Sequence, residues 1–346
     1  RVLFRSQGSF DDVEVRDPRC KKVKARLGFV RSENLSSRVI ETAGLPSQGR
    51  IAVIEMAAAA GLHLLDRKDR DPWKTSTHGV GDLMAYASQK KVDAILLGIG
   101  GSATNDLGFG ALQTLGIRFL DEAGESIDGI RPFDWPRLVQ IDGSLIDLPP
   151  VRIACDVENP LMGPSGATAV YGRQKGFDDR DLAHAEKELN RVAQLLAATH
   201  GADGMIFNEP GAGAAGGLGF GLRVVSDATF VSGFNLFSAW LGLNERVTES
   251  DWVITGEGRF DFSSLQGKGP CSVAKMAARK GASVLILAGS VDQQAAEELQ
   301  AICPEIKIHS ISRPELSLQE NLRETPKRLA KVLQELIETE HWNRDH

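Results

Sequence analysis

The stretch LLGIGGSATNDLGFGALQTLGIRFLDE, residues 96–122, decides the fold. Its Gly98, Gly100 and Ala103 fit the pattern G-x-G-x-x-[GA] of a dinucleotide-binding turn. Asp121 ends a strand-like run and stands where such a site carries the acid that binds the ribose. The pattern predicts a strand, a glycine turn and a helix, and it raises the question of which ligand the turn binds.

The segments around this turn predict alternating strands and helices. Residues 91–98 form an apolar run that predicts a buried parallel strand, and residues 106–115 predict the helix after it. Residues 13–53 contain three β-type segments separated by polar turns, which favours an antiparallel meander. Residues 251–311 alternate strand and helix, and we expect a last helix with a Thr N-cap and a first-position Pro at residues 325–326. This rhythm predicts an α/β fold with parallel sheets covered by helices.

The composition is that of a globular protein without a nucleic-acid or membrane partner. The chain has 346 residues, of which 42% are hydrophobic and 25% charged, and its formal net charge is −6. Nucleic-acid binders usually present a basic surface, so we expect none here. The four cysteines form no C-x-x-C pair, which argues against a disulfide framework or a zinc site and favours a reducing cytoplasm. The longest nearly apolar run, residues 51–65, is too short to span a membrane.

Four glycine-rich segments are the candidates for chemistry. They are residues 98–106, 154–176, 210–221 and 255–269, and three of them follow expected strands. Glycine lets a ligand approach the backbone closely, and the helix N-terminus expected after the first segment favours an anion. Each segment also has a purely structural explanation: a tight turn, a helix cap, a flexible linker, or a loop whose charges pair with each other. Together, four such segments favour a site for phosphate or carboxylate groups.

The last of these segments, TGEGRFDFSSLQGKG, combines glycines with Glu257, Asp261 and Lys268 directly after a predicted strand. We expect a loop there. Carboxylates and a lysine beside a glycine turn suit Mg²⁺ and phosphate. The segment is not a Walker A loop, because Lys268 is followed by Gly269 rather than by Ser or Thr. It therefore predicts a phosphate-handling loop of another kind.

With these segments in hand, the chain resembles the glycerate kinase type 1 family, the glycerate 2-kinases. The matching stretches are AVIEMAAAAGL, GIGGSATND, ACDVENPLMGPSGA, PGAGAAGGLGFGL and ITGEGRFDFSSLQGKGP, which follow the family's order and lie between about Val13 and the C-terminus. The resemblance answers the opening question. The turn at Gly98 continues with Thr104, Asn105 and Asp106, polar groups that a dinucleotide turn does not require.

The resemblance implies transfer of the γ-phosphoryl group of ATP to D-glycerate, with Mg²⁺, to give 2-phosphoglycerate. It implies two α/β domains: an inserted flavodoxin-like domain at residues 11–245, and a parallel-sheet domain whose C-terminal part is residues 246–346. Residues 1–6 look like translated adapter sequence, and the family's PDSFKG-type motif and DGGEG-type loop are absent, so we expect an N-terminally truncated chain. We expect a cytoplasmic kinase whose partners are ATP and D-glycerate, without nucleic acid or membrane, and the chain is compatible with a homodimer.

The resemblance and the strand-end positions also nominate site residues. The expected catalytic residues are Asp156, Lys268 and Asp261, with Asp156 as the base because it directly follows a strand. Glu257 and Asp261 are the expected Mg²⁺ ligands. The expected ligands of ATP and glycerate are Gly100, Gly101, Ser102, Thr104, Asn105, Asp106, Asn159, Gly211, Gly213, Gly216, Gly217, Glu257, Gly258, Arg259 and Gln266.

Several alternatives stay open at this point. Either Arg259 or Lys175 could bind the glycerate carboxylate. An NAD-dependent hydroxy-acid dehydrogenase would use the opening glycine pattern and Asp121, but it leaves the other three glycine segments unexplained. An inactive truncated homologue that binds small anions is the non-enzymatic alternative. Assays for ADP and for NADH would separate the three.

Overall fold

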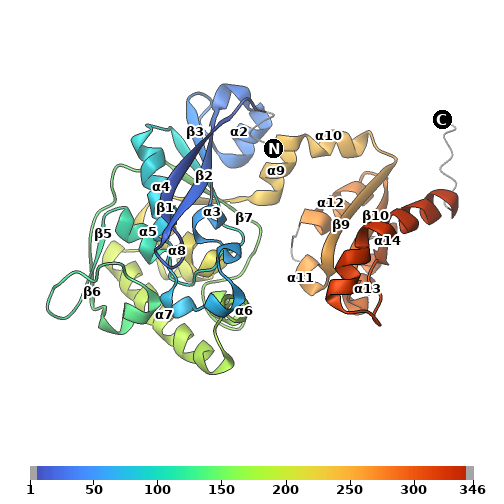
Figure 1. Cartoon of the computed structure of the whole chain (residues 1–346). Helices are drawn as coiled ribbons and strands as arrows, with labels where there is room; N and C mark the ends of the chain where they lie inside the picture. Colours follow the sequence, from blue (N-terminus) through green and yellow to red (C-terminus); the bar gives the residue numbers. More distant parts are fainter. Residues whose placement is uncertain (1–5, 266, 268, 340–346) are drawn as a thin grey trace. The chain divides into compact units, whose positions relative to one another are not determined.

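The computed structural model describes residues 6–265, 267 and 269–339. Contacts within the chain divide it into two compact units, and the boundary in the sequence lies between Leu241 and Gly242. Figure 1 draws the first unit from blue to yellow and the second in orange and red. None of the described helices combines the length and the apolar character that crossing a membrane requires. The assignment of the first unit to an inserted flavodoxin-like domain stays a prediction.

The first unit is built on a six-stranded sheet with the order β1-β2-β3-β4-β7-β8. The first three strands pair antiparallel, which confirms the predicted meander. From β3 to β8 every pair is parallel, which confirms the buried parallel strand at residues 94–98. The strands are β1 (Ser9–Arg16), β2 (Lys22–Arg31), β3 (Arg50–Glu55), β4 (Ala94–Gly98), β7 (Val151–Cys155) and β8 (Thr229–Ser232).

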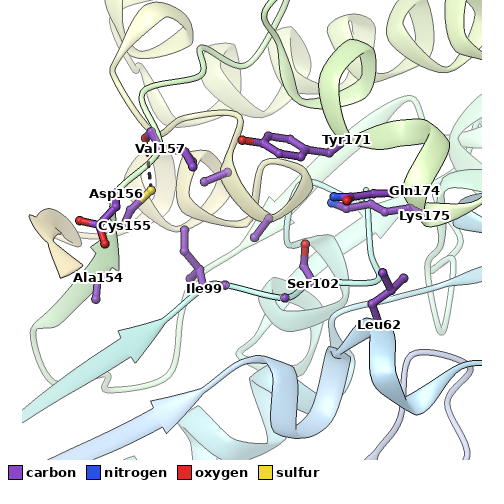
Figure 2. Close-up of a pocket in the computed structure, with 14 residues that line it drawn as sticks. Leu62, Ile99, Ser102, Ala154, Cys155, Asp156, Val157, Tyr171, Gln174 and Lys175 are labelled. Atoms are coloured by element: carbon purple, nitrogen blue, oxygen red, sulfur yellow. Dashed lines mark hydrogen bonds between the residues drawn. The ribbon is translucent and has the colours of Figure 1, made fainter. Parts of the chain in front are cut away.

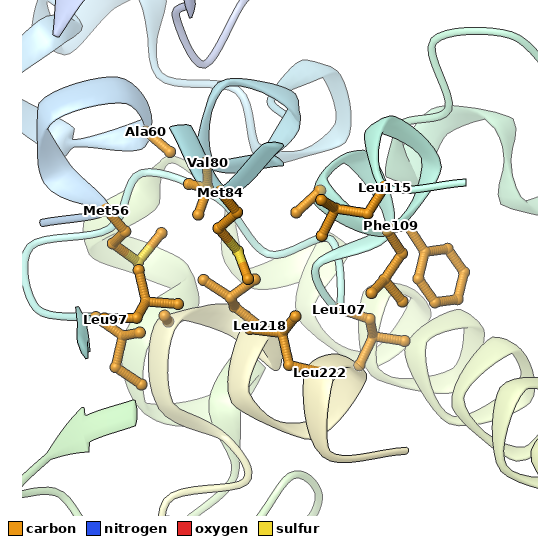
Figure 3. Packing of buried hydrophobic residues seen from close by; sticks show 14 of the residues in the cluster. Met56, Ala60, Val80, Met84, Leu97, Leu107, Phe109, Leu115, Leu218 and Leu222 are labelled. Carbon is orange, nitrogen blue, oxygen red and sulfur yellow. The ribbon is translucent and has the colours of Figure 1, made fainter. Parts of the chain in front are cut away.

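Helices cover both faces of this sheet because apolar residues alternate along its central strands. Ile51 of β3 and Leu96 of β4 pack in one cluster with α2 and α9, whereas Ile54 and Leu97 pack in the larger cluster on the other face. Figure 3 shows part of that larger cluster, with Leu97 and Met56 on one side, Phe109 of α5 on the other, and Met84 of α4 and Leu218 of α8 between them. The helices are α2 (Ser37–Ala43), α3 (Ala57–Ala60), α4 (His78–Gln89), α5 (Phe109–Thr114), α6 (Ala167–Lys175), α7 (Asp179–His200), α8 (Leu218–Val225) and α9 (Gly233–Leu241).

Two further strands of the first unit lie outside the main sheet. They are β5 (Ile117–Leu120) and β6 (Gln140–Gly143), and they pair antiparallel in a sheet of their own. The remaining elements are single 3₁₀ turns at Ser32–Asn34, Leu62–Leu64, Arg67–Asp69, Pro72–Lys74, Pro132–Arg137, Gly204–Asn208 and Ala214–Gly216.

The second unit contains a three-stranded parallel sheet with the order β11-β10-β9, as the alternating sequence predicts. Its core forms where α12 packs on β9 and β10 and α13 packs on β11. The elements are α10 (Leu243–Thr248), β9 (Trp252–Phe260), α11 (Phe262–Leu265), α12 (Gly269–Ala278), β10 (Ser283–Val291), α13 (Gln293–Ile302), β11 (Ile306–Ser310) and α14 (Leu318–Thr339).

Two predictions for the second unit are wrong. The glycine stretch after Thr255 is not a loop, because β9 continues through it to Phe260 in register with β10. The last helix does not begin at Thr325; Pro326 lies inside α14. The helix begins earlier because the Ser317 hydroxyl and the Glu320 carboxylate cap each other's backbone N–H groups, at 3.4 and 2.9 Å, in a capping box.

Candidate functional site

A cavity of about 360 Å³ lies at the carboxyl ends of the neighbouring parallel strands β4 and β7. Ligands of open α/β sheets bind at this edge, because the loops that follow the strands converge there. Figure 2 shows the cavity with Cys155 and Asp156 on one side and Gln174 and Lys175 on the other. Its lining residues are Leu62, Ile99, Gly100, Gly101, Ser102, Ala154, Cys155, Asp156, Val157, Tyr171, Gln174, Lys175, Ala214 and Ala215.

The first glycine segment supplies part of one wall. Gly100, Gly101 and Ser102 line the cavity, and a Cβ added at Gly100 would find no atom within 4 Å. Gly101 has φ +72°, a backbone conformation that favours glycine. The turn is not followed at once by a helix, because α5 begins at Phe109 instead of residue 106. The helix N-terminus that the sequence predicted directly after the turn, as an attraction for anions, therefore lies three residues further along the chain.

The polar residues after that turn are buried. Thr104, Asn105 and Asp106 are at most 1% exposed. The Asp106 carboxylate accepts five hydrogen bonds: from the backbone and the hydroxyl of Thr77, both at 2.8 Å, from the Ser76 hydroxyl, and from two backbone N–H groups at the start of α5. Asp106 thus holds the loop against α4 and α5 rather than facing the cavity.

In the segment after β7, Asp156 lines the cavity, whereas Asn159 stabilises the surrounding chain. Asp156 lines the cavity, but its Oδ1 accepts the backbone N–H of Phe234 at 2.8 Å and the hydroxyl of Ser232 at 3.2 Å, which caps the start of α9. Asn159 binds the Tyr171 hydroxyl through Oδ1 at 2.7 Å, and its Nδ2 donates to a backbone carbonyl. The structure therefore confirms the helix-cap interpretation of Asp156, and its catalytic role stays a prediction.

The third glycine segment packs against the first. A Cβ at Gly216 would lie 2.3 Å from the carbonyl oxygen of Thr104, so only glycine fits there. Gly213 meets the backbone of residue 160 in the same way. The cavity is lined by Ala214 and Ala215 instead of by the four predicted glycines of this segment. Ala215 itself has φ 55°, a strained conformation for a residue with a side chain.

Helix α6 supplies the charged wall of the cavity. Tyr171, Gln174 and Lys175 follow the spacing i, i+3, i+4, which places them on one helix face. The Lys175 ammonium is buried, and its Nζ donates a hydrogen bond of 2.7 Å to the carbonyl oxygen of Thr104. Burial lowers the pKa of Lys175 to about 7, although the Asp106 carboxylate pulls it upward. The helical spacing in the second glycine segment was the signal that could have identified this face from the sequence.

Cys155 is the other titratable group with a strongly altered environment. Burial raises the pKa of its thiol to about 11, and the thiol donates to the carbonyl oxygen of Val157 at 3.4 Å. A thiol of that pKa is fully protonated near neutral pH and is a poor nucleophile. Cys155 therefore serves as part of the cavity wall rather than as a reacting group.

The fourth glycine segment belongs to the second unit. Glu257, Gly258 and Arg259 lie in β9, and Asp261 follows it. Arg259 Nε lies 3.4 Å from the Asp261 carboxylate, and the arginine side chain is 70% exposed. The structure does not describe Gln266 and Lys268, so both expectations fall outside the residues it places.

A protein-only metal centre is absent from the described part of the chain, where no three His, Cys, Asp or Glu side chains come together. Mg²⁺ commonly takes one or two carboxylates and completes its shell with phosphate oxygens and water. Glu257 and Asp261 offer the hard oxygen donors that such a shared site needs. The donor chemistry thus fits an ion that arrives with a nucleotide.

Asp121 has no place in a dinucleotide site. It directly follows β5, which pairs with β6 in a separate sheet and is not the neighbour of β4 that a Rossmann unit requires. Its carboxylate accepts the N–H groups of Ala123 and Glu125 and lies 3.3 Å from Arg137. These contacts hold the pKa of Asp121 below its usual value, chiefly through the hydrogen bond from Glu125. Asp121 is a turn residue, so the dehydrogenase alternative lacks the acid that would bind the ribose of the dinucleotide.

Comparisons with known proteins agree with the motif order. The family model described as the Glycerate kinase family matches residues 2–340. A glycerate kinase of Halalkalibacterium halodurans is 43% identical over 72% of this chain and 66% of its own length. The glycerate 2-kinase of Escherichia coli K12 is 38% identical over 74% of this chain and 68% of its own length.

The fold agrees as well. A crystal structure from Salmonella typhimurium LT2, assigned as a glycerate kinase 2, superposes with a TM-score of 0.68 at 32% identity, over 98% of this chain and 84% of that one. The chain spans about two thirds of the length of the first relatives it matches. The family model, the sequence relatives and the solved structure identify the same family, and this chain belongs to the glycerate kinase family.

Proposed function

We propose that the protein is a glycerate 2-kinase, which phosphorylates the 2-hydroxyl of D-glycerate with ATP. The observation that carries the proposal is the match to the family along residues 2–340, together with a cavity at the strand ends of the first unit. That cavity holds a buried cation beside a glycine turn, which is the combination a small anionic substrate needs. The localisation that we propose for this reaction is the cytoplasm.

In the proposed reaction, the glycerate 2-hydroxyl oxygen forms a bond to the γ-phosphorus of ATP. The bond from that phosphorus to the bridging oxygen of ADP breaks, and the hydroxyl proton passes to a base. Catalysis of this kind depends mainly on positioning and on compensation of charge. We assign the base to Asp156, whose Oδ1 is held by α9 while Oδ2 accepts no hydrogen bond from any described residue.

The second unit is proposed to act on the phosphates. Lys268 would offset negative charge on the transferring group, and Glu257 and Asp261 would supply oxygen ligands to Mg²⁺. When bound, the ion neutralises part of the phosphate charge. Arg259, which lies near Asp261, would hold that carboxylate in place. These roles rest on the family motif and on residue chemistry.

The test is a coupled assay for ADP with D-glycerate, ATP and Mg²⁺, followed by enolase, which consumes 2-phosphoglycerate directly. We expect ADP formation that depends on D-glycerate, and a product that enolase accepts without a mutase. The same chain is assayed in parallel for NADH formation with NAD⁺ and D-glycerate. Formation of NADH without ADP, or a product that requires a mutase before enolase acts, would contradict the proposal.

A further inference from the structure

The buried lysine of the cavity has no carboxylate partner among the described residues. Lys175 is 1% exposed, and the single hydrogen bond from its Nζ goes to the carbonyl oxygen of Thr104. An ammonium group has three donors, so this leaves it poorly satisfied. A buried charge without a counter-ion is costly, and proteins usually pair it. A ligand that enters the cavity can supply the missing negative charge.

No described carboxylate forms an ion pair with Lys175. The Asp106 carboxylate attracts it from nearby, but the five hydrogen bonds of that carboxylate come from Ser76, Thr77 and the start of α5, and none comes from Lys175. Burial favours the neutral thiol of Cys155, and Asp156, which forms its hydrogen bonds at the start of α9, lies across the cavity from Lys175 (Figure 2). The titratable side chains that line the cavity with Lys175 are Cys155, Asp156 and Tyr171; Asp106 lies near enough to attract it, and Arg70 donates to the backbone carbonyl of the neighbouring Gln174.

We propose that Lys175, with the Ser102 hydroxyl and the backbone at Gly100 and Gly101, forms the subsite that binds the carboxylate of the hydroxy-acid substrate. The inference rests on the proposed function and chooses between two cations that the sequence left open. The other, Arg259, is 70% exposed, lies near Asp261, and belongs to the second unit. An exposed, paired guanidinium gains little from a further carboxylate.

The cavity suits a monocarboxylate better than a polyphosphate. Lys175 is the single cationic side chain in its described lining, and most of the rest is apolar or neutral. A triphosphate needs several positive groups or a metal ion to balance its charge. The volume of about 360 Å³ is at the lower end for ligand pockets. Charge and size therefore both favour a small acid with one negative charge.

Binding should be coupled to proton uptake. With a pKa of about 7, Lys175 is largely neutral at pH 8 in the free protein. A bound carboxylate favours the charged ammonium and raises its pKa. At pH 8 the complex should therefore take up about one proton, and at pH 6, where Lys175 is already charged, the uptake should approach zero. An exposed surface lysine would take up none at either pH.

The experiment is calorimetric titration of the full chain with D-glycerate, without ATP, in buffers of different ionisation enthalpy at pH 8 and pH 6. We expect Lys175→Met to weaken binding at least 100-fold at pH 8, and Lys187→Met, which changes an exposed lysine of α7, to bind and take up protons like the parent. Gly100→Val fills the cavity without changing the lysine and should also abolish binding. Circular dichroism establishes that each variant is folded.

Four results would overturn the inference: no binding by the parent, no proton uptake at pH 8, unchanged binding by Lys175→Met, or tighter binding of inorganic phosphate than of D-glycerate at this site. The last would assign the cavity to a phosphate. The ADP assay separates this inference from the proposed function. Glycerate-dependent ADP formation with lysine-independent binding defeats the inference alone. Lysine-dependent proton uptake without any ADP formation supports the inference and defeats the kinase assignment.

Discussion

Glycines that follow predicted strands have different structural roles in the two units. In the first unit, the chain after β4 leaves the sheet at Gly100 and Gly101 and lines a cavity. In the second unit, Gly256 and Gly258 stay inside β9 and remain in the sheet. A Cβ at Gly256 would lie 2.4 Å from the carbonyl oxygen of Leu287, so glycine there serves the pairing of strands. The same sequence signal thus accompanies a cavity wall in one place and close strand packing in the other.

The comparison teaches that the free space around a glycine indicates its role better than the surrounding sequence does. Gly100 faces open space inside the cavity, whereas Gly216 presses against the backbone of Thr104 and Asn105. Both belong to segments that the sequence nominated for the same task. Substitutions that add one methyl group should therefore separate the two classes of glycine.

The largest expected effect is at Gly216. Gly216→Ala should lower the free energy of unfolding by about 3 kcal/mol or more, because φ is +69° and the new Cβ meets backbone atoms at 2.3 and 2.5 Å. Gly258→Ala in β9 has nothing within 4 Å of its Cβ and should cost about 1 kcal/mol or less. Urea denaturation of both variants measures the difference. Equal losses would contradict the packing role assigned to Gly216.

The next effect concerns the buried charge. Lys175→Met should raise the free energy of unfolding by on the order of 3–5 kcal/mol near pH 6, because it removes a buried ammonium whose pKa is lowered to about 7. The folded chain binds that proton less tightly than the unfolded chain, whose lysine has the ordinary pKa of 10.5. The penalty is therefore complete below pH 7 and disappears as the pH rises toward 10.5.

Urea denaturation at pH 6 and pH 9.5 tests this dependence. The advantage of Lys175→Met over the parent should shrink at the higher pH, and Lys187→Met should show no such advantage at either. A Lys175→Met chain that is less stable than the parent at pH 6 would show that the ammonium stabilises the cavity. That result would contradict our inference that the buried ammonium of Lys175 lowers stability for the sake of substrate binding.

A smaller effect separates Asp106 from Asp121. Asp106→Asn should cost about 2–3 kcal/mol of unfolding free energy, because an amide cannot accept all five buried hydrogen bonds. Asp121→Asn changes an exposed turn and should cost less than about 1 kcal/mol. We also expect reduced phosphoryl transfer for Asp106→Asn alone. Loss of activity in Asp121→Asn with normal folding would favour the dehydrogenase alternative.

The smallest effect is acid sensitivity of the first unit at His78. Burial lowers the pKa of His78, whose Nδ1 lies 2.5 Å from the Ser76 hydroxyl and whose Nε2 lies 3.1 Å from Gln113 Oε1. The unfolded chain then binds the proton more tightly, so stability should fall as the pH drops below 6.5, by up to about 1.4 kcal/mol per unit of pKa shift. Urea midpoints at pH 7 and pH 5 measure the loss, and His78→Gln should reduce it. An unchanged pH dependence in that variant would contradict this assignment.

Much of the fold follows from the sequence because hydrophobic periodicity and turn residues are local signals. The meander was expected at residues 13–53 and lies at residues 9–55, and the strand expected within residues 91–98 lies at residues 94–98. The failures come from tertiary contacts. Pairing with β10 keeps the glycines of residues 256–258 in a strand, and the capping box at Ser317 overrides the Pro326 signal.

The site was predictable in part. Gly100, Gly101, Ser102 and Asp156 line the cavity as their strand-end positions suggest. Burial depends on the whole fold, so the sequence could not show that Asp106 faces inward or that Lys175 lies in an enclosed wall. Leu62 is an apolar lining residue without a chemical signal, and Tyr171 was marked only by its helical spacing to Gln174 and Lys175.

The most direct test of the central claim, that the cavity of the first unit binds glycerate, is equilibrium dialysis with labelled D-glycerate. Gly100→Val places a side chain in the open space of the cavity, and Gly204→Val places the same side chain in open space on an exposed turn elsewhere in the unit. We predict a dissociation constant at least 100-fold weaker for Gly100→Val and unchanged for Gly204→Val, with both variants as stable as the parent. Equal affinity in the parent and both variants would contradict the claim.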